Sequence, residues 1–149
     1  MITHALHPSF WAALLGWMVA QSIKMVCSFV ETKRLDFSYM VSTGGMPSAH
    51  SAMASALATS IGLCEGFDSA LFAFGCAFAV VVMFDAQSVR KAAGEQAKLL
   101  NQIVDELLRE HHLSENKLKE LLGHTRLEVF MGFLTGIATA LAAFRFIHP

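Results

Sequence analysis

Charged residues are scarce in this chain. Asp, Glu, Lys and Arg make up 15% of its 149 residues, whereas apolar residues make up 54%. Soluble domains carry about 25% charged residues, so this composition favours a membrane protein. The formal net charge is −1. Proteins that bind the phosphate backbone of nucleic acids usually carry an excess of basic residues, so we expect no nucleic-acid partner.

Cysteine is also rare, and the N-terminus has no basic residue. Cys27, Cys64 and Cys76 are isolated and lie within or beside apolar runs, which predicts buried free thiols instead of a disulfide framework or a metal site. Residues 1–9 contain no Lys or Arg, and no convincing cleavage site follows the first apolar run. We therefore expect that run to be a retained span and not a cleaved signal peptide.

Four apolar segments stand out, at about residues 10–29, 47–63, 68–84 and 126–147. A membrane span needs roughly 20 apolar residues, with about 17 as the lower limit. The first and fourth segments meet this length, and the other two lie near the limit. The pattern predicts an all-α, polytopic membrane bundle of about four transmembrane helices, with residues 1–149 forming a single domain.

Small residues explain how the second segment could pack inside such a bundle. They let neighbouring helix backbones approach closely in lipid, and they are Ala52, Ser55, Ala56 and Thr59. Gly132 and Gly136 form a similar pair in the fourth segment, which would pack either within the bundle or against a second copy in a homo-oligomer. The alternative, a soluble bundle of buried helices, finds its best support in the polar second segment.

The polar stretch 85–123 separates the third and fourth segments. Its apolar residues recur at helical spacing and predict that the third span continues as an amphipathic helix; they are Val89, Ala93, Ala97, Leu100, Val104 and Leu107. Ser114 is expected to cap a further short helix through Leu122, which Gly123 would end. Thr125 and Glu128 have the spacing of a capping box that starts the last span.

Basic residues are unevenly distributed between the connecting segments. Lys33 and Arg34 follow the first span, and six further Lys and Arg residues lie within 85–123, whereas the opposite side holds little besides Glu65 and Asp68. The positive-inside rule then places both basic loops in the cytoplasm and both termini outside. We expect an integral protein of a bacterial-type inner (plasma) membrane.

The unusual polar residues gather near one face of the predicted bundle. Ionisable groups at the ends of spans are costly and by default indicate a functional site; here they include Lys24, Arg34, His50, Asp85, Arg90 and His124. Lys24 alone could instead extend its ammonium to the interface. Asp85 would pair with Arg90 or hold Lys24 in place.

The segment from Gly44 to His50 predicts an anion site. Gly44 and Gly45 permit a tight turn, and Pro47 suits the first position of a helix. The free N–H groups of the helix start and its dipole then favour an anion, with the Ser48 hydroxyl and the His50 imidazole beside it. The alternative is a glycine turn and a helix cap beside an unrelated histidine.

These motifs resemble a known superfamily. Pro47-Ser48-Ala49-His50 is similar to the Pro-Ser-Gly-His motif of the type 2 phosphatidic acid phosphatases and vanadium haloperoxidases. The closer match, over about residues 10–145, is to their small divergent branch of membrane proteins. Its hallmarks appear as Ala20-Gln21, Lys24, Gly44-Gly45-Met46-Pro47-Ser48-Ala49-His50-Ser51, Phe84-Asp85-Ala86, Val89-Arg90, Ala93-Gly94, Gln96-Ala97, Leu100-Asn101 and Leu122-Gly123-His124-Thr125.

The resemblance implies a role for each matched residue. His124 would be the nucleophile that forms a phosphohistidine, Glu128 the carboxylate that orients it, and His50 the acid that protonates the leaving alcohol. The phosphate group would be held by Lys24, Arg34, Ser48 and Arg90, with Gly45 and Asp85 in support. Fixed cations and helix-start amides supply the charge that phosphoryl transfer requires, so no metal or cofactor is expected.

The expected function is hydrolysis of a lipid phosphate or similar phosphomonoester at the cytoplasmic face. Ala49 stands where the family has Gly, Glu128 where it has Asp, and Arg90 lies 34 positions before His124 instead of a few. These differences leave open an inactive phospholipid-binding or scaffolding protein that kept the anion pocket. A transporter is disfavoured because the polar residues do not line a midplane path. His111 and His112 point about 100° apart on a helix and predict no metal site.

Overall fold

In the computed structural model, residues 6–33, 45–111 and 124–147 are described, and they form helices without any strand. The elements in chain order are α1 (Pro8–Thr32), α2 (Ala49–Glu65), α3 (Ala70–Phe84), the π-helical turn η2 (Asp85–Val89), α4 (Arg90–His111) and α5 (Arg126–Ile147). The predicted all-α class is confirmed.

Local sequence sets where the first helix begins and ends. Pro8 occupies the start of α1, where its missing N–H costs no hydrogen bond, and the His7 ring Nδ1 accepts from the Ser9 N–H at 3.4 Å. The helix ends at Lys33, which adopts a left-handed conformation (φ 56°) and donates its N–H to the Phe29 carbonyl at 2.9 Å.

Helix α2 is the centre of the bundle and contacts α1, α3 and α5. Its small side chains let all three neighbours approach, and ten of its residues are buried: Ala49, Ser51, Ala52, Ala54, Ser55, Ala56, Ala58, Ser60, Ile61 and Gly62. Glycine in a neighbouring helix also permits the close contact: a Cβ at Gly16 of α1 would lie only 2.8 Å from the Ala56 Cβ. The predicted close packing of the second segment is confirmed.

The glycine pair of α5 packs within the bundle. A Cβ at Gly132 would overlap the Ser48 carbonyl, and one at Gly136 would overlap the Ser55 hydroxyl. That hydroxyl also lies 3.1 Å from the Phe133 carbonyl of α5. The sequence allowed this glycine face to pack either within the bundle or against a second copy of the chain. In the structure it packs within the bundle, against α2.

Large apolar side chains cover the outside of the bundle, while its centre is built of alanine and serine. Phe74, Phe84 and Phe146 are between 67% and 88% exposed, as expected where lipid and not water surrounds the helices. Within the described residues, three helical stretches are long and apolar enough to cross a membrane, at Pro8–Val30, Ala70–Asp105 and Arg126–Phe146. α2 is one more helix, of 17 residues, enclosed among them.

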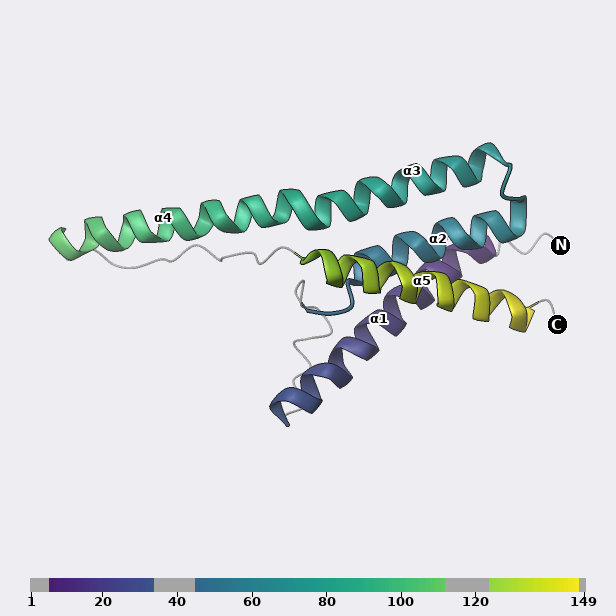
Figure 1. Ribbon diagram of the computed structural model, residues 1–149, viewed down its shortest axis with the longest axis horizontal. Helices are drawn as coiled ribbons and strands as arrows, with labels where there is room; N and C mark the ends of the chain where they lie inside the picture. The colour runs from purple at the N-terminus through teal and green to yellow at the C-terminus, as the bar shows by residue number, and fades with distance from the viewer. Residues whose placement is uncertain (1–5, 34–44, 112–123, 148–149) are drawn as a thin grey trace.

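Helices α3 and α4 follow one another through η2 as one long rod, and α4 extends beyond the other helices (Figure 1). The sequence predicted this continuation. It did not predict the π-helical turn. Such turns are rare in proteins, and those that occur often lie at functional sites.

The two ends of the bundle differ. The start of α1 and the end of α5 lie at one end, whereas α2 and α5 both begin at the other end, where α3 passes into η2 (Figure 1). The convergence of these helix starts places the residues before and within their first turns close together.

Two local predictions were wrong. α2 begins at Ala49 with Ser48 as its N-cap, so Pro47 lies before the helix and not at its first position. The cysteines are free, but Cys27 and Cys64 are exposed, because the surface of a membrane bundle also takes apolar side chains. The helix expected from Ser114 to Leu122, its end at Gly123, and His112 lie outside the described residues.

Candidate active site

Lys24 enters the site from α1. It lies one turn beyond Ala20, which packs with Ala49 and Ala52 at the start of α2, and Lys24 is only 3% exposed. Gly45 lies beside it: its φ of 89° is a conformation that suits glycine, and a Cβ there would lie 3.4 Å from Lys24 Cγ. Gly45 therefore gives room to the aliphatic part of a buried cation.

Ser48 starts α2 and joins it to α5. Its side chain accepts from the Ser51 N–H at 3.4 Å and from the Ser51 hydroxyl at 3.1 Å. Its own N–H donates to the Glu128 carbonyl at 3.0 Å. Because Gly132 also packs on the Ser48 carbonyl, the first turns of α2 and α5 are held in one relative position.

Ala49, which stands where the resemblance expects glycine, is 4% exposed and packs against Ala20 and Ala52. Its methyl group contributes to the contact between α1 and α2. The substitution therefore has a packing role in this structure.

His124 precedes α5 and is 2% exposed. Its Nδ1 lies 2.8 Å from Oε2 of Glu128. A carboxylate only accepts hydrogen bonds, so Nδ1 carries a proton and the lone pair of a neutral ring lies on Nε2. The carboxylate of Glu128 also acts electrostatically on the Lys24 ammonium.

The second imidazole comes from the first turn of α2. The ring centroids of His50 and His124 lie 6.4 Å apart with the ring planes inclined by 60°. At this distance the two side chains, 74 positions apart in the sequence, can both reach a single small anion placed between them.

The π-helical turn holds the His124 backbone. The His124 N–H donates to the Ala86 carbonyl at 3.1 Å, and η2 contacts α5. Asp85, at the start of η2, is exposed, and its ion pair with Arg90 or Lys24 stays a prediction. The sequence named Ala86 only as part of the family resemblance and gave it no role, because it acts through a main-chain atom.

Two of the predicted cations lie outside what the structure describes. Arg34 falls in the range 34–44, together with Gly44, and only the backbone of Arg90 is described, as the first residue of α4. Of the four residues predicted to hold phosphate, Lys24 is the cation whose side chain is described, and it interacts electrostatically with Glu128. Gln21, one turn before Lys24, is 6% exposed; the sequence offered it only as part of the family resemblance.

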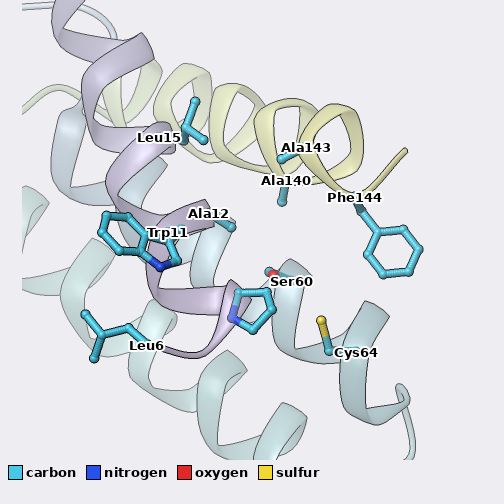
Figure 2. Close-up of a pocket in the computed structure, with 10 residues that line it drawn as sticks. Leu6, Trp11, Ala12, Leu15, Ser60, Cys64, Ala140, Ala143 and Phe144 are labelled. Carbon is cyan, nitrogen blue, oxygen red and sulfur yellow. The ribbon is translucent and has the colours of Figure 1, made fainter. Parts of the chain in front are cut away.

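A separate groove of about 340 Å³ lies between the start of α1, the end of α2 and the last turns of α5 (Figure 2). Figure 2 shows Trp11, Leu15, Ala143 and Phe144 around it, with Cys64 at the end of α2. Its lining is almost wholly apolar and includes neither histidine nor carboxylate. Such a lining offers no acid–base pair for hydrolysis.

Comparisons with known proteins agree with these observations. Residues 6–139 match the sequence profile of a family described as the divergent PAP2 family. The chain is 45% identical over 141 residues to the uncharacterized membrane protein YuiD of Bacillus subtilis (strain 168), with 87% of this chain and 89% of that protein covered. No solved structure matches.

Proposed function

Because the chain belongs to the divergent PAP2 family of membrane proteins, we propose that it is a phosphatase that hydrolyses a phosphomonoester at the end of the bundle where His50 and His124 lie. The observation that carries the proposal is their 6.4 Å separation, with Glu128 on Nδ1 of His124. A nucleophile oriented by a third group and faced by an acid is the arrangement that such chemistry requires.

The first half of the reaction transfers the phosphoryl group to the protein. The Nε2 lone pair of neutral His124 attacks phosphorus, a P–N bond forms, and the bond from phosphorus to the ester oxygen breaks. Protonated His50 gives its proton to that oxygen, and the alcohol leaves. Glu128 stabilises the positive charge that develops on the His124 ring, at 2.8 Å from its Nδ1.

The second half returns the site to its starting state. His50, now neutral, takes a proton from water as the water oxygen attacks phosphorus. The P–N bond breaks, the electron pair returns to Nε2 of His124, and phosphate leaves. One water is consumed, and each imidazole regains its original protonation.

The charge of the phosphate would be balanced by Lys24 and by the start of α2. Lys24 is buried beside Gly45 and Glu128, and a buried cation interacts with an anion more strongly than an exposed one does. Arg34, Arg90 and the Ser48 hydroxyl belong to the same proposed clamp. The helix start adds its dipole.

A lipid phosphate is the proposed substrate, because a membrane bundle presents its ends at the level of lipid headgroups. We place this end in the cytoplasm of a bacterial-type inner membrane, as the distribution of Lys and Arg predicts. The headgroup would then reach the histidines while its acyl chains stay in the bilayer.

Purified protein in detergent or nanodiscs tests the proposal. With phosphatidic acid or a soluble phosphomonoester, and with EDTA present, we expect phosphate release that vanadate inhibits. His124→Ala should reduce turnover by about 10³-fold or more. His7→Ala is the matched control, because His7 pairs with Glu65 at 3.2 Å, outside the site, and it should keep full activity. Normal turnover by His124→Ala would remove His124 from the mechanism.

One observation favours a second candidate, a lipid-phosphate-binding or scaffolding protein without turnover. Ser48 is wholly buried and its hydroxyl serves as the helix cap, so its part in holding phosphate would require a rearrangement. This candidate predicts binding of phosphatidic acid vesicles that depends on Lys24, with no phosphate released under any condition.

A further inference from the structure

Thr125 and Glu128 form a complete capping box at the start of α5. The Glu128 N–H donates to the Thr125 Oγ1 at 3.3 Å, and the Thr125 N–H donates to Oε2 of Glu128 at 3.3 Å. These two bonds satisfy N–H groups that a helix start otherwise leaves without a partner.

The box shares an atom with the histidine site. The Glu128 oxygen that accepts from Thr125 is Oε2, the same atom that lies 2.8 Å from Nδ1 of His124. A capping box turns its glutamate back toward the residues before the helix. In this chain the residue immediately before the cap is His124, so the turned-back carboxylate reaches the imidazole.

The His124 backbone has supports of its own. Its N–H is bonded to the Ala86 carbonyl, and the Glu128 carbonyl is bonded to the Ser48 N–H. A change confined to the Thr125 side chain would leave both bonds in place. It would remove the hydroxyl that accepts from the Glu128 N–H and so loosen the capping box that turns the Glu128 carboxylate toward His124.

We propose that Thr125 is a positioning residue that fixes the Glu128 carboxylate on Nδ1 of His124 and so keeps the Nε2 lone pair available for attack on phosphorus. The inference rests on the proposed function for its effect on turnover. Its effect on the imidazole proton does not depend on turnover. Thr125 does not contact the reacting atoms.

Thr125 is exposed, which allows a clean substitution. Thr125→Val keeps the shape of the side chain and removes the acceptor, whereas Thr125→Ser keeps the acceptor. Neither variant opens a cavity in the core. The pair therefore separates the hydroxyl from the bulk of the side chain.

Nitrogen-15 NMR of histidine-labelled protein in micelles reports which ring nitrogen carries the proton, and a His124→Gln sample identifies the His124 signals. We expect the Nδ1–H form in the natural protein and in Thr125→Ser. Thr125→Val should shift His124 toward a mixture of the two neutral forms. In phosphate-release assays it should lower kcat about tenfold with little change in KM, and Thr125→Ser should restore kcat.

Two results would overturn the proposal. One is an unchanged proton position and kcat in Thr125→Val. The other is an equal loss of kcat in the Val and Ser variants with the Nδ1–H form retained. Where Thr125→Val folds poorly, Thr125→Ala, which also removes the capping oxygen, takes its place and should show the same mixture of neutral forms. Absence of phosphate release by the natural protein would refute the proposed function alone, since the NMR result stands without turnover.

Discussion

The Nδ1 atom of His124 lies 2.8 Å from Oε2 of Glu128, one helical turn further along α5. The histidine side chain is 1% exposed and the glutamate side chain 21%. A charge-assisted hydrogen bond in such a sheltered place is stronger than one in water. Glu128 therefore serves the helix start and the imidazole together.

Glu128→Gln should lower kcat by roughly 10- to 100-fold, because a hydrogen bond to a charged group contributes about 1.5–3 kcal/mol and the amide lacks the charge. The measurement is steady-state phosphate release, with KM determined in parallel. Arg126→Gln, a neutral change at an exposed position of the same helical turn, is the control. Equal kcat values for Glu128→Gln and the natural protein would leave the carboxylate a purely structural role.

Lys24→Met should weaken the binding of inorganic phosphate or vanadate by about tenfold or more, since it removes a buried cation from the proposed anion site. Isothermal titration or inhibition by vanadate measures this affinity. Lys33→Met, an exposed change at the end of α1, is the matched control and should bind as the natural protein does. Indistinguishable affinities in the two variants would contradict a role for Lys24 in binding the anion.

Gly136→Ala should destabilise the bundle by about 1–3 kcal/mol, the usual cost of overpacking, because the added methyl group would overlap the Ser55 hydroxyl and the Ala52 carbonyl. Denaturant unfolding in detergent measures the loss. Ala142→Val adds apolar bulk at an exposed position of the same helix and should change stability little. A Gly136→Ala protein as stable as the natural one would mean that α2 and α5 do not pack as described.

Deleting Ser88 should convert the π-helical turn to regular α-helix. The regular helix would close over the missing residue, and the Ala86 carbonyl would then return to the helix ladder and no longer face the His124 N–H. We expect a loss of phosphate release with the helical circular dichroism retained. Deletion of Ala97, within α4 and beyond η2, is the control and should leave phosphate release unchanged. Loss of phosphate release on deleting Ala97 but not on deleting Ser88 would argue against a role for η2 in positioning His124.

The two tryptophans test how α1 lies in the membrane. Trp11 and Trp17 are 54% and 37% exposed, and six residues of α-helix separate them by roughly 9 Å along the axis. In single-tryptophan variants, lipids brominated near the end of the acyl chain should quench Trp17 more strongly than Trp11. Stronger quenching of Trp11 would contradict a span that begins at Pro8.

Much of the architecture could be predicted from periodicity and residue size. The apolar runs gave the helices, and the small residues of the second segment marked the helix that packs against three others. The capping box at Thr125 and Glu128 was recognisable because its residues lie three apart and depend on local geometry alone. The start of α2 was misplaced by two residues, since Ser48 and not Pro47 supplies the boundary.

The candidate site was harder to predict because its parts are held by contacts far apart in the sequence. The family resemblance singled out His50, His124 and Glu128. Nothing local indicated that the Ser48 N–H bonds to the Glu128 carbonyl or that Ala86 holds His124. Main-chain hydrogen bonds do not require a particular residue type, so the sequence does not indicate them. The π-helical turn at Asp85–Val89 was missed for the same reason.

An experimental structure of the protein with vanadate bound would test the central claim most directly. Vanadate is a tetrahedral anion that resembles the phosphoryl group during transfer. We predict vanadium bonded to Nε2 of His124, with His50 within hydrogen-bonding distance of a vanadate oxygen and Glu128 still on Nδ1. Vanadate bound elsewhere, or His50 and His124 found at opposite ends of the bundle, would contradict the account.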